Sequence, residues 1–132
     1  MTEEEALINS FVVKRKRDRL AGLLANPKRR TEATSTLAHF GDLDVRWVIR
    51  LTAAQQDAAS VEQALRSRGA GDTCYAVSEA AALDGKRLPL RQALEQVIGY
   101  GMGTLLSCIP GALGFYEGEG PSDRCILERR AI

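Results

Sequence analysis

The sequence predicts an α+β protein in which about four helices pack against a mixed sheet of about five strands, in the order ααβαβαβββ. Apolar residues recur at helical spacing over residues 3–41, whereas residues 44–130 contain several short apolar runs separated by turn signals. The chain has 132 residues, of which 45% are hydrophobic and 27% charged, as expected for one globular domain covering residues 1–132.

The first predicted helix covers residues 3–25, and its apolar residues change face part-way along. They form two sets at helical spacing, namely Leu7, Ile8, Phe11 and Val12, and then Val13, Leu20, Leu23 and Leu24. Either this helix bends between the two sets, or its halves pack against different partners.

A second helix is predicted over residues 26–41. Asn26 is a favourable N-cap, Pro27 suits the first helical position, and Gly41 is a typical stop signal. Leu37 and Phe40 are its expected buried residues.

The sheet-forming part alternates strands with helices and then ends in strands only. Residues 44–51 and 73–78 read as strands, with a helix between them that begins at a Thr52–Gln55 capping box and ends before Gly69. After a turn at Asp84-Gly85, a fourth helix begins near Leu90 and ends at Gly99.

Three further strands are predicted near residues 104–109, 112–117 and 124–129. Short turns require antiparallel pairing among these three. Helical crossovers favour parallel pairing among the first three strands, and the result is a mixed sheet.

Cysteine usage and hydropathy predict a cytoplasmic protein that does not enter a membrane. The three cysteines (Cys74, Cys108 and Cys125) lie in apolar stretches without C-x-x-C spacing, which is typical of buried free thiols. The N-terminus is acidic, unlike that of a signal peptide, and no apolar run approaches the roughly 20 residues that cross a bilayer.

The most informative feature is an uneven distribution of charge. The net charge is only +1, yet residues 14–30 contain one acid, Asp18, and eight basic residues: Lys14, Arg15, Lys16, Arg17, Arg19, Lys28, Arg29 and Arg30. The segments before and after carry −3 each. A concentration of charge of this kind indicates either a binding surface or a solvated helix face whose cations pair with acids of the chain itself, such as Glu3, Glu4, Glu5 or Glu32.

The placement of Lys28, Arg29 and Arg30 favours an anionic ligand. They would occupy the first turn of the second helix, where the helix dipole disfavours cations by a few tenths to about 1 kcal/mol each. A phosphate would reverse that penalty, because free N–H groups, the dipole and the basic side chains would all face it. The eight basic residues therefore predict binding to the phosphates of a nucleic acid, with DNA and RNA not distinguished.

Two alternatives remain open at this stage. The same basic residues could bind an acidic protein, or a small-molecule enzyme or sensor could have its pocket near Gly99–Thr104, Cys108, Glu79 and Glu117. The Gly99–Gly103 glycines follow a helix rather than a strand, so they do not match a dinucleotide or phosphate loop.

His39 is the only histidine, and no motif supports a metal site with Asp42 and Asp44 or a dyad with Cys74 or Cys108. The sequence thus predicts no catalytic residue, cofactor or metal, and leaves the oligomeric state undetermined.

Overall fold

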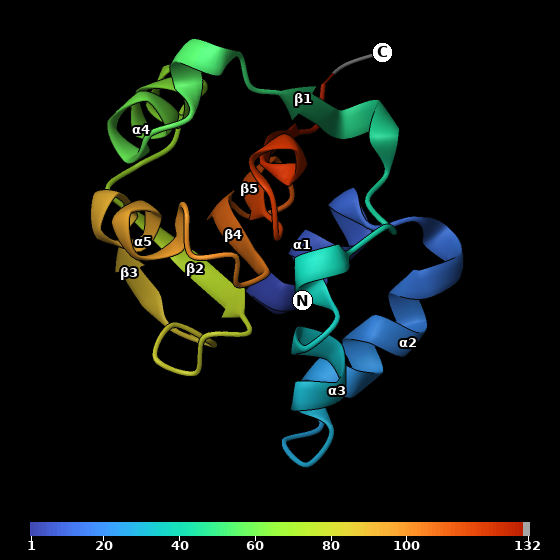
Figure 1. Ribbon diagram of the computed structural model, residues 1–132. Coiled ribbons are helices and arrows are strands. Elements are labelled where there is room, and N and C mark those ends of the chain that lie inside the picture. The colour runs from blue at the N-terminus through green and yellow to red at the C-terminus, as the bar shows by residue number, and fades with distance from the viewer. Residues whose placement is uncertain (131–132) are drawn as a thin grey trace.

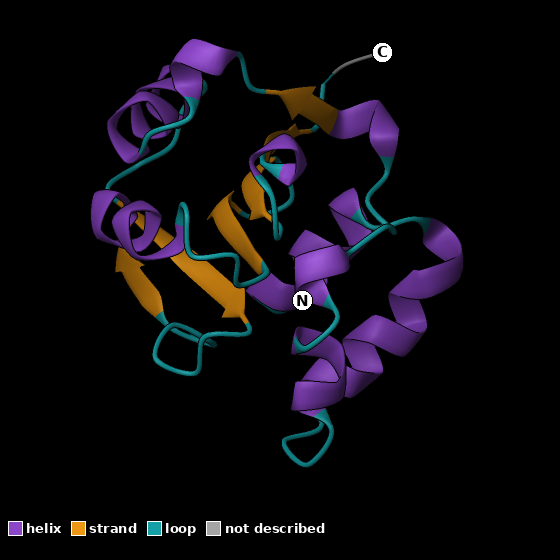
Figure 2. Ribbon diagram, in the orientation of Figure 1, coloured by secondary structure: helices purple, strands orange, loops and turns teal. Residues whose placement is uncertain are grey.

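The computed structural model describes residues 1–130 and arranges them in three layers, with one sheet between two layers of helices (Figure 1, Figure 2). The α+β class is confirmed, with five α-helices and six strands. The helices are α1 (Glu3–Phe11), α2 (Lys14–Ala25), α3 (Arg30–Thr34), α4 (Ala58–Ser67) and α5 (Leu90–Val97). Four 3₁₀ turns join them: η1 (Leu37–His39), η2 (Val45–Trp47), η3 (Ala53–Gln55) and η4 (Pro121–Asp123).

The six strands form one sheet in the order β1-β6-β5-β4-β2-β3, and every neighbouring pair is antiparallel. The strands are β1 (Val48–Arg50), β2 (Thr73–Ser78), β3 (Arg87–Pro89), β4 (Thr104–Ile109), β5 (Leu113–Glu117) and β6 (Cys125–Glu128). The second predicted strand and the last three therefore lie where the sequence places them.

The predicted parallel pairing is wrong. β1 and β2 run in the same direction, but β6, β5 and β4 lie between them. The sequence reading also missed β3, a three-residue strand that follows the Asp84-Gly85 turn and forms a hairpin with β2. That hairpin reverses the chain, so α5 leads from β3 across β2 to β4, and no two parallel strands become neighbours.

Helices cover both faces of the sheet, so its central strands β4 and β5 are buried at nearly every residue. Leu105 packs into the core formed with α1, α2 and α3, and the next residue, Leu106, packs into the core formed with α4 and α5. Every residue of β5 is buried for the same reason. Phe11 and Phe115 are among the largest fully buried side chains of these two cores.

The first predicted helix is two helices. Val12 and Val13 adopt extended backbone (φ −97° and −57°, ψ 144° and 141°), and Val12 forms a β-bridge with Leu43. The Val13 N–H donates to the carbonyl of Asp42 at 2.8 Å. The change of apolar face seen in the sequence marks this break, which lets α1 and α2 present different faces to the core.

The predicted helix over residues 26–41 is wrong in its start and its length. Asn26 does not cap a helix; its side chain accepts a hydrogen bond from the Lys28 N–H at 3.0 Å and forms a turn over residues 27–29. The helix α3 begins at Arg30 and ends at Thr34, and η1 follows it. Leu37 is fully buried as expected, and Phe40 is half-buried.

Two other elements begin later than predicted. Asp44 caps η2, so the strand over residues 44–51 is reduced to β1. The Thr52–Gln55 capping box is present, but it closes η3, and α4 begins only after the N-cap Asp57.

The three cysteines are all buried, as predicted. Burial raises the pKa of the Cys74 thiol to about 11 and that of Cys125 to about 12. Within residues 1–130, no helix combines the length and the apolar character that a membrane-crossing segment requires.

Candidate functional site

The eight basic residues predicted as an anion-binding site do not form one cluster. Lys14, Arg15, Lys16, Arg17 and Arg19 belong to α2, Lys28 and Arg29 to the turn after it, and Arg30 is the first residue of α3. The environments of these three groups differ.

The first turn of α2 contains four cations and no acid. The N-cap, Val13, has an aliphatic side chain that makes no capping hydrogen bond. Cations near a helix N-terminus are disfavoured by the dipole, and the first N–H groups of any helix lack partners inside it. The sequence predicts cations at the positive end of a helix over residues 28–30, but in the structure this unfavourable placement occurs at residues 14–17.

Arg17 is the one of these four that turns back to its own backbone. Its Nε donates to the Val12 carbonyl at 2.8 Å, and its side chain is half-buried. This hydrogen bond stabilises the break between α1 and α2.

The remaining cations of α2 are exposed, and we call this set, Lys14, Arg15, Lys16 and Arg19, the α2 basic face. Within residues 1–130, Lys14, Lys16 and Arg19 form no ion pair. Arg15 approaches Asp42 only at 3.9 Å, and its side chain stays 73% exposed. An exposed contact of that length contributes little, so all four cations can meet an external anion.

Lys28 and Arg29 extend this charge beyond the end of α2. Both are exposed, and Arg29 Nε forms an ion pair with Glu32 Oε2 at 2.6 Å. Because that pair is open to solvent, Arg29 can exchange Glu32 for another anion at low cost.

Arg30, which the sequence predicts as an anion-binding residue, is already bound by two acids of the chain itself. Its guanidinium donates to both oxygens of Glu4 at 2.9 and 2.7 Å and to both oxygens of Asp84 at 2.6 and 3.0 Å. Hydrogen bonds to Asp84 and then Glu4 raise the pKa of Arg30 far above its usual value. The cation is neutralised inside the molecule and joins α1, α3 and the turn after β2.

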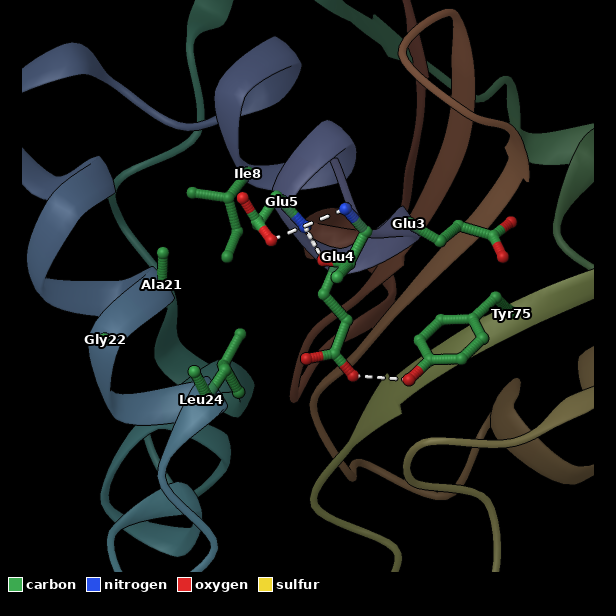
Figure 3. Close-up of a pocket in the computed structure, with 10 residues that line it drawn as sticks. Glu3, Glu4, Glu5, Ile8, Ala21, Gly22, Leu24 and Tyr75 are labelled. Atoms are coloured by element: carbon green, nitrogen blue, oxygen red, sulfur yellow. Dashed lines mark hydrogen bonds between the residues drawn. The ribbon is translucent and has the colours of Figure 1, made fainter.

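Tyr75 completes this network from β2. Its hydroxyl donates to Glu4 Oε2 at 2.5 Å, as Figure 3 shows. Burial, followed by the hydrogen bond to Glu4, raises the pKa of Tyr75 to about 12. The network lies beside a cavity of about 570 Å³ between α1 and α2.

The acids around that cavity already have structural partners. Glu5 closes the capping box of α1 with Thr2, and Glu3 forms an ion pair with Arg87. Together with Glu4 they place negative charge in the first turn of α1, where the helix dipole stabilises it. The side chains in the first turn are thus acidic in α1 and basic in α2. The helix dipole stabilises the acids of α1 and destabilises the cations of α2.

We expect Arg30→Met to lower the free energy of unfolding by about 1.5–3 kcal/mol, because it removes charge-assisted hydrogen bonds and leaves Glu4 and Asp84 without a cation. Urea denaturation followed by the fluorescence of Trp47, the single tryptophan, measures this loss. Arg29→Met is the matched control and should remain near the wild type, because its pair with Glu32 is exposed. Equal stability of both variants would contradict the structural role of Arg30.

The two carboxylates of the enzyme alternative accept hydrogen bonds from backbone N–H groups. Glu79 accepts a hydrogen bond from the Gly103 N–H at 2.7 Å, and Glu117 accepts one from the Gly99 N–H at 3.1 Å. Glu117 also forms a buried ion pair with Arg124, which sequence reasoning missed. Burial raises the pKa of the Cys108 thiol well above its usual value, which disfavours the nucleophilic thiolate.

His39 lies at the surface, with its Nε2 3.2 Å from Glu119 and a side chain that is 74% exposed. Of the two acids considered with it in the sequence, Asp44 binds Arg46 and Asp42 lies 3.9 Å from Arg15. Within residues 1–130, no group of three or more metal-ligating side chains is present.

Comparison of this chain with models of known protein families, with curated proteins and with solved structures gives no match.

Proposed function

We propose that this protein binds the phosphates of a nucleic acid through the α2 basic face, with Lys28 and Arg29 as flanking contacts. One observation carries the proposal. The first turn of α2 holds the exposed cations Lys14, Arg15 and Lys16, and within residues 1–130 their one ion pair is the 3.9 Å contact of Arg15 with Asp42.

The physical argument is that an external anion relieves a conflict within the fold. Lys14, Arg15 and Lys16 repel one another and the positive end of their own helix, so they oppose folding. A phosphate placed there would interact with the helix N-terminus and with these side chains together. Binding would therefore remove the repulsion that destabilises the unbound protein, and this free energy would add to the affinity.

An acidic protein would satisfy the same cations, and charge alone does not discriminate between the two partners. A nucleic acid offers a regular row of phosphates, and a helix about 18 Å long with cations along its first half can contact several of them. The enzyme alternative has no comparable support, because Glu79 and Glu117 are committed to backbone groups and to Arg124. A cytoplasmic location belongs to this proposal and fits three buried free thiols.

The expected result is salt-dependent binding that charge reversal on α2 abolishes. With about four phosphates contacted, the affinity for a short labelled oligonucleotide should fall roughly 50- to 150-fold between about 50 and 200 mM salt. The variant Lys14→Glu/Lys16→Glu/Arg19→Glu should lose more than about tenfold in affinity and most of the salt dependence. Fluorescence anisotropy measures both.

The control variant is Arg50→Glu/Lys86→Glu/Arg130→Glu, which changes the net charge equally at exposed residues away from α2. It should bind nearly as the wild type does. The α2 variant should also be no less stable than the wild type, because acids replace cations at a helix N-terminus. Equal loss in both variants, or binding of an acidic polypeptide but of no oligonucleotide, would overturn the proposal.

A further inference from the structure

A groove runs along the α2 basic face, between α2 and the segment over residues 32–42. We call it the α2–η1 groove. Its volume is about 220 Å³, and Lys16 and Arg19 line one side. Leu20 and Leu23 of α2 contribute apolar surface, and His39 and Phe40 line the groove from the opposite segment. Figure 1 shows α2 and α3 side by side, with the chain returning toward the sheet beyond α3.

The groove brings an aromatic surface to the cations, which the sequence alone does not show. Phe40 is half-buried, and its ring centroid lies 6.5 Å from that of Tyr116, which anchors it to the sheet. His39 beside it is exposed. Proteins that bind single strands combine a positive groove with aromatic side chains on which bases stack.

The groove also contains hydrogen-bond acceptors. Asp42 and Glu32 line it, and among residues 1–130 the Asp42 side chain, which is 31% exposed, has only the 3.9 Å contact to Arg15. Carboxylates accept hydrogen bonds from the amino groups of bases such as cytosine. In a duplex the flat face of each base is covered by its stacked neighbours, so an unpaired base is the better match for a groove that contains an aromatic side chain.

The size of the groove is consistent with one flat ring. Pockets that enclose a whole small-molecule ligand measure about 300–1,000 Å³. A second hollow shares Arg19 and Leu23 with the groove and extends to Asn26 and Arg29. It leaves room for the nucleotides that follow the bound base.

From these contacts we infer that the α2–η1 groove holds an unpaired base of a single-stranded nucleic acid, stacked near Phe40, with its flanking phosphates on Lys16 and Arg19. This inference rests on the proposed function and specifies its substrate class: single strands in preference to duplexes.

The test compares three probes of about 12 nucleotides: an oligodeoxycytidine, an abasic strand of the same length, and a duplex. Stacking of one base contributes roughly a 5- to 150-fold gain in affinity. The wild type should therefore bind the oligodeoxycytidine at least about fivefold more tightly than either other probe. Phe40→Leu should remove most of that difference and leave the affinity for the abasic strand unchanged.

Two further variants separate stacking from loss of structure. Phe40→Trp should restore the preference, because it returns an aromatic ring to the groove. Tyr100→Leu removes an aromatic side chain that is 69% exposed but lies outside the groove, and should change nothing.

The outcomes distinguish this inference from the proposed function. If all three probes bind equally and Phe40→Leu is neutral, the groove takes no base, and phosphate binding by the α2 basic face stands. If no probe binds at low salt, both proposals fail. A preference that persists in Phe40→Leu would also overturn the role of the groove.

Discussion

Replacing Arg124 by methionine is expected to lower the free energy of unfolding by about 3–5 kcal/mol. Its guanidinium and the Glu117 carboxylate are 5% and 2% exposed, and they bind each other at 2.5 and 2.8 Å. Arg124 also donates to the backbone and side chain of Gln56, at 3.0 and 2.9 Å. Without Arg124, a buried carboxylate has no opposite charge, and that loss is measured by urea denaturation followed through Trp47 fluorescence.

The double variant Glu117→Gln/Arg124→Met is the control for this prediction. It removes both charges, so no ion is left buried alone, and it should be more stable than Arg124→Met. A single variant as stable as the wild type would show that the pair contributes little to folding. A double variant less stable than the single variant would show that charge compensation is not the cause.

Replacing Gly103 by alanine is expected to cost about 3 kcal/mol or more, because the chain passes too close to η1 for any side chain. A Cβ at this residue would collide with the backbone of Leu37 and Ala38 and would lie 2.6 Å from the Leu37 Cβ. The Gly103 N–H and carbonyl are both bound to Glu79, so the backbone there cannot easily shift.

Gly22 is the matched control for that substitution. It lies in α2, and nothing lies within 4 Å of a Cβ built on it, so Gly22→Ala should raise the free energy of unfolding by up to about 1 kcal/mol. Urea denaturation of the two variants measures the contrast. If Gly103→Ala unfolds as the wild type does, then the packing of η1 against the loop before β4 is looser than the structure shows.

Two contacts of η1 matter for the proposed function, because they fix the side of the α2–η1 groove that lies opposite α2. Gly103 allows η1 to approach the sheet, and Tyr116 of β5 donates its hydroxyl to the Leu37 carbonyl at 2.5 Å. His39 and Phe40 follow directly, so their position depends on the sheet and not on α2. We therefore expect a single-strand preference to be more sensitive to Gly103→Ala than phosphate binding is.

Residues missed in the sequence reading have identifiable signals. Glu117 ends β5 and Arg124 directly precedes β6, so the hairpin between these two apolar strands brings their side chains together. Glu119 and Asp123 lie in the same loop, so the local pattern suggests a pair with Arg124 but does not single out its partner. No similar signal indicates the partners of Arg30, because Glu4 and Asp84 are 26 and 54 residues away.

Local pattern was enough to predict the α+β class, the last three strands, the burial of the cysteines and a concentration of cations over residues 14–30. Those features depend on spacing, hydropathy and turn residues within a few positions of one another. The partners of each cation, the order of the strands and the placement of Phe40, Lys16 and Arg19 along one groove depend on residues far apart in the chain. They emerge only when both faces of the sheet are covered and the chain has folded back on itself, because burial of distant apolar surface then outweighs local preference.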